Sequence, residues 1–136
     1  MLLSLERSFT VSWIISLVIL IALLAYALFN FFSQRRAVKP LSQEEFIEGY
    51  RKAQLFDVRE PNEYEGGHIL GARNVPLTQI KTRLTELRQD KPIYLYCQNS
   101  MRSAKAAQIL RKKGYTDIYQ LKGGFKQWTG KIRSGK

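Results

Sequence analysis

Cys97, the only cysteine among the 136 residues, is the side chain with the clearest capacity for covalent chemistry. It follows a short apolar run, Ile93 to Tyr96, and precedes a polar turn and a helix-forming stretch. An apolar run of this length, bounded here by Pro92, predicts a buried parallel strand. N–H groups of the turn and the N-terminus of the helix would then face the sulfur and favour the nucleophilic thiolate. An inert buried cysteine is the alternative.

The spacing from Cys97 to Arg102 is Cys-x4-Arg, and it sets the size of the loop around the thiolate. Cysteine phosphatases use Cys-x5-Arg, in which the longer loop wraps a phosphoryl group and the arginine binds it through two hydrogen bonds. A loop one residue shorter suits a single sulfur atom carried on the cysteine better than a tetrahedral oxyanion. The residues of the predicted active-site loop are Gln98, Asn99, Ser100, Met101, Arg102 and Ser103.

Three segments of the chain form a combined signal. They are the loop itself, the segment from Asp57 to Pro76 with its DVRE and GGHILGARNVP sequences, and the LKGGFKQW sequence from Leu121 to Trp128. Together these segments resemble rhodanese-type sulfurtransferases. These segments occur in the order typical of the family and cover about residues 41 to 130. One position departs from the family pattern, because many members have glycine where this chain has Ser100. If that position requires a positive φ angle, Ser100 is modestly strained.

This resemblance implies a ping-pong transfer of sulfur through Cys97. The thiolate would take a sulfane sulfur from a donor, thiosulfate or a persulfide, and pass it to a thiol or another nucleophile. Backbone N–H groups of the loop would stabilise charge on the terminal sulfur, as an oxyanion hole does. Arg102 would either hold the loop in shape or help to bind an anionic donor. With a single cysteine in the chain, the acceptor is expected to be an external thiol or protein.

Residues elsewhere in the chain are expected to support the site. Asp57 and Arg59 end the preceding strand and are possible supporting residues, although an ion pair of Arg59 with Glu63 or Glu65 is preferred to substrate contact. His68, the only histidine, is expected to form a structural hydrogen bond, because one histidine and one distant cysteine do not make a metal site. We therefore expect neither a cofactor nor a metal.

The elements that must position these residues alternate between strand and helix. Strands are predicted at 54–58, 72–75, 93–96 and 118–121, and helices at 43–52, 62–65, 78–88 and 103–113. This alternation predicts an α/β fold, with a central parallel sheet, helices on both faces and a site at the carboxyl ends of the strands. The rhodanese fold is of this kind. Ile80, Leu84 and Leu87 are expected on the buried face of the helix at 78–88, and Gly114 is expected to end the helix at 103–113.

The N-terminal region reads as a membrane anchor. Between Arg7 and Arg35 there is no charged residue, and the apolar run from Val11 to Phe32 would span roughly 33 Å as a helix, enough for a hydrocarbon core of about 30 Å. The alternative is a cleaved signal peptide with a small-x-small site at 25–27. The apolar run continues past that site into Arg35-Arg36, which favours an uncleaved anchor.

The sequence therefore divides into five parts. They are a short flank (1–10), a transmembrane helix (11–32), a basic juxtamembrane linker (33–40), a rhodanese-like domain (41–130) and a basic tail (131–136). Arg7 alone precedes the helix, whereas Arg35, Arg36 and Lys39 follow it, so the positive-inside rule predicts a single-pass protein with its catalytic domain on the cytoplasmic side. A reducing compartment also suits a free catalytic thiol.

The formal net charge is +11, and the excess cations lie in the second half of the chain. Residues 91–136 hold eleven Lys and Arg residues but one acid, Asp117. This basic surface either is a solvated face that attracts anionic lipid of the bilayer or steers small anionic sulfur donors, or an acidic persulfide carrier, to Cys97. Nucleic acid is not an expected partner, because the chain shows no recognition motif.

Three classes of function remain open. A membrane-anchored sulfurtransferase is favoured, because the thiol, the loop length and the flanking segments agree. A phosphatase or arsenate reductase is disfavoured by the loop length. The other alternative is a membrane-tethered, non-catalytic module for protein interaction or for sensing redox state or sulfur. The sequence leaves the physiological donor, the acceptor and the oligomeric state open.

Overall fold

The computed structural model describes residues 2–136, apart from the side chains of residues 34–37, and divides into two compact units after Ser33. Met1, the first residue of the expected flank, lies outside the described residues. The first unit is formed by helix α1 (Leu2–Ala37), whose last residues lie beyond the division. The second unit, residues 34–136, holds the sheet and the remaining helices.

Within the first unit, α1 is apolar around its whole circumference. Its large apolar side chains, among them Trp13, Ile19 and Phe29, are all exposed. A soluble helix would bury one apolar stripe and present polar residues elsewhere, so this pattern is typical of a helix that lies in an apolar environment. By length and composition Leu2–Ser33 could cross a membrane, although an N-terminal signal sequence would pass the same test.

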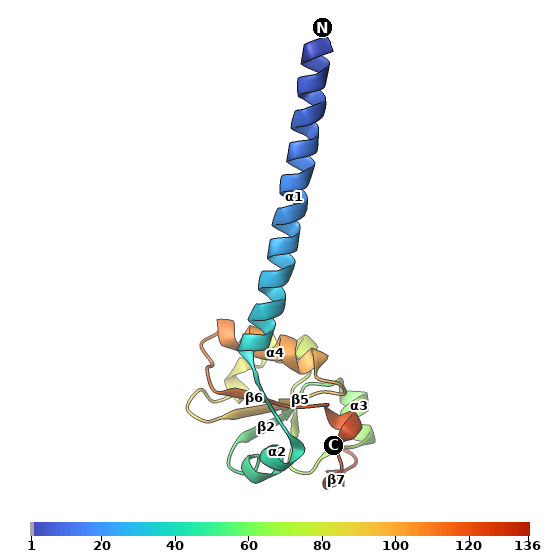
Figure 1. Ribbon diagram of the computed structural model, residues 1–136. Helices are drawn as coiled ribbons and strands as arrows, with labels where there is room; N and C mark the ends of the chain where they lie inside the picture. The colour runs from blue at the N-terminus through green and yellow to red at the C-terminus, as the bar shows by residue number, and fades with distance from the viewer. Residues whose placement is uncertain (1) are drawn as a thin grey trace. The chain divides into compact units, whose positions relative to one another are not determined.

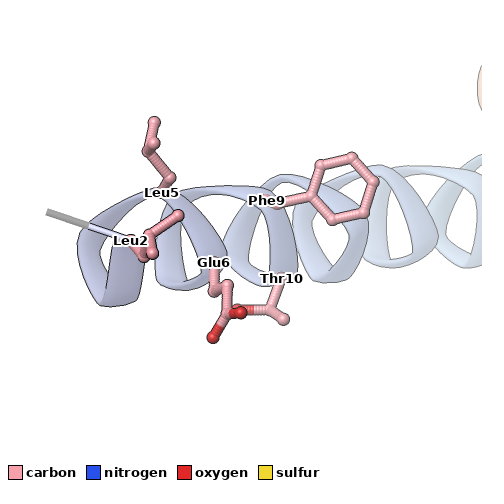
Figure 2. A pocket seen from close by; sticks show the side chains of 5 residues that line it. All are labelled: Leu2, Leu5, Glu6, Phe9 and Thr10. Carbon is pink, nitrogen blue, oxygen red and sulfur yellow. The ribbon is translucent and has the colours of Figure 1, made fainter.

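The first turns of α1 carry a shallow hollow, which Figure 2 shows from close by. Its side chains lie three or four positions apart on the helix: Leu2, Leu5, Glu6, Phe9 and Thr10. Residues at these spacings are neighbours on a helix surface. The hollow is therefore a groove between successive turns of one helix, and we assign no binding site to it.

The second unit is built on a five-stranded sheet in the order β1-β6-β5-β2-β4. The strands are β1 (Lys39–Leu41), β2 (Gln54–Asp57), β4 (Arg73–Asn74), β5 (Ile93–Tyr96) and β6 (Ile118–Leu121). All four neighbouring pairs are parallel. The expected parallel sheet is thereby confirmed, and the carboxyl ends of β2, β5 and β6 meet at one edge.

Helices cover both faces of this sheet, with α4 and α2 on opposite sides (Figure 1). They are α2 (Gln43–Gly49), α3 (Pro61–Gly66), α4 (Met101–Lys112) and the 3₁₀ helices η1 (Leu77–Thr82), η2 (Leu84–Glu86) and η3 (Phe125–Gln127). Side chains of β5 alternate between the two cores: Leu95 packs with Leu110 of α4, and Tyr96 packs with Phe46 of α2. Both faces of the central strands are buried, which explains their continuous apolar sequence.

Local sequence signals set the ends of two helices. Ser42 and Glu45 form a capping box at the start of α2, in which each side chain accepts a hydrogen bond from the other residue's backbone N–H. Gly114 follows α4 with a φ angle of +99°, a conformation that favours glycine. The predicted stop at Gly114 is confirmed.

The predicted α-helix at 78–88 is wrong, because the chain forms η1 and η2 there. The expected buried face is nevertheless retained: Ile80 and Leu87 are buried, and Leu84 packs against the same core. The Thr82 hydroxyl donates to the carbonyl of Gln79 at 2.9 Å. Such local hydrogen bonds compete with the α-helical pattern and favour the tighter 3₁₀ turn.

Both ends of the second unit are more ordered than the sequence predicts. The expected linker at 33–40 is helical to Ala37, and its last two residues belong to β1, which pairs with β6. The side chains of Arg35 and Arg36 lie outside the described part of the chain. The expected tail contains β7 (Ile132–Arg133), antiparallel to β3 (His68–Ile69). Pairing satisfies the backbone groups that these strand edges would otherwise expose.

Candidate active site

Strand β5 carries Cys97 to the carboxyl edge of the sheet, where the chain leaves the strand and turns into α4. Cys97 directly follows Tyr96, whose carbonyl accepts the N–H of Val58 at 3.0 Å and so keeps the strand end paired. The residue is fully buried. This position at the end of a central parallel strand is where sites of α/β sheets form.

Two backbone N–H groups point at the sulfur of Cys97. Ser100 donates to Sγ at 3.0 Å and Ser103 donates at 3.3 Å. The Ser103 hydroxyl oxygen lies 3.4 Å from the same sulfur. Two N–H dipoles and the N-terminus of α4 place positive potential at Sγ, which favours a thiolate or a terminal persulfide sulfur. Of the six predicted loop residues, Ser100 and Ser103 therefore contact the sulfur directly.

Ser100 occupies the left-handed conformation, with φ of +84° and ψ of −8°. Among the described residues it is the only one besides glycines with a positive φ. This conformation costs a non-glycine residue about 1–2 kcal/mol, and here it turns the N–H toward the sulfur. The Ser100 hydroxyl donates to the Leu121 carbonyl at 3.2 Å, which helps to hold the turn.

The Gly123-Gly124 turn supports the loop from the side. The N–H of Phe125 donates to the Cys97 carbonyl at 2.8 Å, and the N–H of Lys126 donates to the Gln98 carbonyl at 3.1 Å. A Cβ on Gly124 would lie 2.5–2.6 Å from these two carbonyl oxygens, too close for any side chain. Two consecutive glycines are typical of a tight turn, but the sequence does not reveal that this turn supports the Cys97 loop.

Arg102 forms a bidentate ion pair with Glu63 of α3. Its Nη1 and Nη2 atoms donate to the two carboxylate oxygens at 2.6 and 2.9 Å. Each side chain is about one-third exposed. The hydrogen bonds from Arg102 lower the pKa of Glu63 below its usual value. In this arrangement Arg102 ties the loop to α3.

Arg59 pairs with Asp57, so the expected ion pair with Glu63 or Glu65 is wrong. Asp57 ends β2 and accepts both Nε and Nη2 of Arg59, the latter at 2.7 Å, in a fully buried pair. Burial opposes the charge on Arg59, but the hydrogen bond and the charge of Asp57 outweigh it and raise its pKa. Arg59 binds Asp57 and not Glu63 because Asp57 is only two residues away and equally buried, whereas Glu63 is bound by Arg102.

The same guanidinium reaches three further groups. It donates to the Gly67 carbonyl at 2.7 Å and to Oε1 of Gln98 at 3.2 Å, and it lies over the Phe125 ring at 4.3 Å. Arg59 therefore links the end of β2 to the first residue of the loop. All of these contacts are with other groups of the protein, so they hold the Arg59 side chain in place.

A known domain type has this combination of parallel sheet and cysteine loop. The family model for the rhodanese-like domain matches residues 42–131. The chain belongs to the rhodanese family. The fold and family expected from the sequence are confirmed. The matched region begins directly after β1, which belongs to the same sheet.

Known proteins resemble this rhodanese over different lengths. The uncharacterized protein YqhL of Bacillus subtilis (strain 168) is 62% identical over 122 residues, which are 90% of this chain and 97% of that protein. The thiosulfate sulfurtransferase GlpE of Pseudoalteromonas translucida is 36% identical over 54% of this chain and 70% of its own. The crystal structure of a rhodanese-related protein from Thermoplasma volcanium is 26% identical, with a TM-score of 0.65, over 70% of this chain and 97% of its own.

The outer loop residues of the rhodanese domain face solvent. Met101 is 68% exposed, and its N–H donates to the Asn99 side chain at 3.3 Å, a local turn contact. Gln98 is held by Arg59 as described. These loop residues, which the sequence groups together, thus separate into sulfur contacts, ion-pair contacts and an exposed rim.

His68 is buried beside α3. Its Nδ1 atom lies 2.8 Å from the Tyr64 carbonyl, and its ring stacks on the Tyr64 ring with a centroid distance of 3.7 Å. Within the part of the rhodanese that the structure describes, no group of three or more His, Cys, Asp and Glu side chains could hold a metal ion. The contacts of His68 are those of a structural hydrogen-bonding residue.

Sequence reasoning missed Gln120 of β6. Its Oε1 accepts the hydroxyl of Ser103 at 2.7 Å, directly behind the sulfur contact. No motif marks this position, because a glutamine in a short strand resembles any other half-buried polar residue. Only the register of the sheet places Gln120 near the site. It pairs with Leu95 of the neighbouring strand β5, two residues before Cys97.

Proposed function

We propose that this protein is a membrane-anchored rhodanese-type sulfurtransferase that carries sulfur on Cys97. The observation that supports this most strongly is the convergence of the Ser100 and Ser103 N–H groups on the sulfur. A short loop with its donors aimed at one atom is suited to stabilising a thiolate and a persulfide. The family membership and the thiosulfate sulfurtransferase relative agree with this chemistry.

The reaction proceeds in two displacements. The Cys97 thiolate attacks the outer sulfur of thiosulfate; a sulfur–sulfur bond to Cys97 forms, the original one breaks, and sulfite leaves with the electron pair. An acceptor thiolate then attacks the terminal sulfur and takes it as a new persulfide, and Cys97 leaves as the thiolate. A persulfide donor enters by the same first step, with a thiolate as the leaving group.

The partners follow from charge and from the single thiol. Exposed lysines lie next to the supporting turn and in the first turns of α4: Lys105, Lys122 and Lys126. The backbone of this turn bonds to Cys97 and Gln98, so its lysines lie near the loop. They favour the approach of a small anionic donor or an acidic persulfide carrier, and the acceptor is an external thiol or protein.

The proposed arrangement in the cell places residues 11–32 across a bilayer. The rhodanese domain, 41–130, then lies on the cytoplasmic side, because the cations Arg35, Arg36 and Lys39 follow the helix and Arg7 alone precedes it. Protease protection in sealed spheroplasts tests this orientation. Cleavage of the domain only after lysis supports it, and cleavage in intact spheroplasts contradicts it.

Steady-state transfer of sulfur from thiosulfate to a thiol acceptor tests the proposed activity. With the full chain in detergent micelles, double-reciprocal plots at several acceptor concentrations should give parallel lines, and Cys97→Ser should abolish transfer. Turnover that persists in Cys97→Ser would contradict the proposal. A folded wild type without transfer from thiosulfate or persulfide donors would instead favour the non-catalytic interaction or sensing module.

A further inference from the structure

The hydroxyl of Ser103 has one hydrogen and three neighbouring acceptors. Gln120 Oε1 lies 2.7 Å away, the Ser100 carbonyl oxygen 3.1 Å away and Cys97 Sγ 3.4 Å away. A hydroxyl can donate to only one of these at a time. Hydroxyl–oxygen hydrogen bonds are most often about 2.7–2.8 Å long and seldom exceed about 3.0 Å, so Gln120 is the acceptor that takes the hydrogen.

The direction of this hydrogen determines whether Cys97 Sγ faces the hydrogen or a lone pair of the Ser103 hydroxyl. When the Ser103 hydrogen points at Gln120, the hydroxyl oxygen presents a lone pair to Cys97, and the S–H of the neutral thiol can donate to it. A thiolate in the same place would face that lone pair without a hydrogen between them. The hydroxyl therefore favours the protonated cysteine, in opposition to the two backbone N–H groups.

We propose that Gln120 is a positioning residue that holds the hydrogen of the Ser103 hydroxyl away from the sulfur, so that the hydroxyl presents to Cys97 a lone pair that favours the neutral thiol over the thiolate. The relevance of this role to sulfur transfer rests on the proposed function. The role itself does not, because the pH dependence of Cys97 alkylation can be measured without a sulfur donor. Ser103 is fully buried and Gln120 is half-buried on a strand that is paired on both sides, so this geometry is held by the sheet.

Charged groups around Cys97 form a constant background to this effect. Arg102 is the loop cation whose charge interacts with the Cys97 thiolate, and it is bound to Glu63 of α3. Asp57 and Arg59, at the end of β2, are paired with each other. The exposed Lys126 belongs to the supporting turn. Gln120→Leu changes none of these charges, so a changed pH profile in that variant reports the hydroxyl.

The test is the rate of alkylation of the full chain by iodoacetamide as a function of pH, in detergent micelles. Because the chain has one cysteine, every modification reports Cys97. In Gln120→Leu the Ser103 hydrogen can turn to the thiolate, a charged acceptor that outcompetes the neutral Ser100 carbonyl. The midpoint of the rate profile should fall by about one pH unit, a tenfold change in the proton equilibrium. Gln120→Glu should raise the midpoint, because a carboxylate accepts the same hydrogen and adds negative charge.

A double-mutant cycle with Ser103→Ala separates positioning from a general change in the site. If Gln120 acts through Ser103, Gln120→Leu should leave the midpoint of Ser103→Ala unchanged. An equal downward shift in both backgrounds, or no shift in the wild-type background, overturns the proposal. Tyr119→Phe, on the opposite face of β6, is the matched control and should not move the midpoint. Should Gln120→Leu fail to fold by circular dichroism, the Gln120→Glu profile decides: an unchanged or lowered midpoint overturns the proposal.

These outcomes remain distinct from failure of the proposed activity. A protein that transfers no sulfur still has a Cys97 thiol whose alkylation can be followed. Loss of transfer with the predicted pH shifts would therefore leave the role of Gln120 intact, whereas full transfer without the shifts would refute that role alone.

Discussion

Two arginine–carboxylate pairs flank the active-site loop and differ in depth. In the inner pair, Arg59 and Asp57 have side chains that are 4% and 0% exposed. In the outer pair, Arg102 and Glu63 are 33% and 30% exposed. In both pairs the guanidinium donates through two of its nitrogens to the two oxygens of its carboxylate. The chemistry of the two pairs is the same, so burial decides what each can do.

Burial makes the inner pair permanent and leaves the outer pair exchangeable. Removing one partner of a buried pair leaves an uncompensated charge and costs about 3–5 kcal/mol. A partly exposed pair contributes only about 0–1 kcal/mol, because water can replace either partner. We therefore expect Arg59 to belong to the scaffold of the loop and Arg102 to be able to leave Glu63 for an anionic donor at small cost. The sequence leaves donor binding open for Arg102 and favours an ion pair for Arg59, but it does not show that the two pairs differ in depth.

The largest expected effect is the loss of the inner pair. Arg59→Met should lower the free energy of unfolding by about 3–5 kcal/mol, because Asp57 stays buried without its partner. Urea denaturation followed by near-ultraviolet circular dichroism measures this change. The matched control is Arg73→Met, which removes an exposed arginine paired with Glu86 and should cost less than about 1 kcal/mol. Equal costs for the two variants would remove the distinction between buried and exposed pairs.

The next effect comes from opening the outer pair. Glu63→Gln removes the charge that holds Arg102, so the arginine becomes available to thiosulfate and KM for the donor should fall about 3- to 10-fold. kcat should stay nearly constant, and steady-state kinetics separates the two parameters. If kcat falls and KM is unchanged, Glu63 instead maintains the shape of the loop.

Salt should reduce the efficiency of sulfur transfer from thiosulfate, because the lysines near the loop are exposed. Raising ionic strength from about 0.05 to about 0.5 M should reduce kcat/KM for thiosulfate several-fold, because screening weakens the attraction of Lys122 and Lys126 for the anion. The double variant Lys122→Gln/Lys126→Gln should show a weaker salt dependence. A salt dependence equal to that of the wild type would argue against steering by these lysines.

The smallest expected effect is on stability at acidic pH. Because Arg102 lowers the pKa of Glu63 in the folded protein, the pair stabilises the fold above the usual carboxylate pKa of 4.5, and this contribution is lost as pH falls through the lower folded value. Between about pH 6 and about pH 3 the wild type should lose up to about 1 kcal/mol relative to Glu63→Gln. Urea denaturation across this range checks the difference. A gain of wild-type stability toward acidic pH would contradict the assignment.

Much of the fold could be predicted because its signals are local. The apolar run at 93–96, the glycine stop at Gly114 and the capping box at Ser42 each act within a few residues, and each appears in the structure. The segment at 78–88 shows the limit of such reasoning. Its apolar face is placed correctly, but the competition between α-helical and 3₁₀ turns depends on hydrogen bonds that periodicity does not encode.

The site could be predicted less completely because its partners are brought together by the sheet. The strain at Ser100 could be anticipated from the resemblance, because many family members have glycine at this position, and the φ angle is positive. The choice of Asp57 over Glu63 by Arg59 depends on depth, and the contact of Ser103 with Gln120 depends on the register between β5 and β6. Neither quantity can be read from residue spacing along the chain.

The account depends above all on Cys97 as the atom that carries sulfur. Intact mass of the full chain after incubation with thiosulfate, beside Cys97→Ser, tests this most directly. We expect a gain of one sulfur atom on the wild type alone, reversed by cyanide or a thiol. A folded wild type that gains no sulfur from thiosulfate or from a persulfide donor, or a gain that persists in Cys97→Ser, would contradict it.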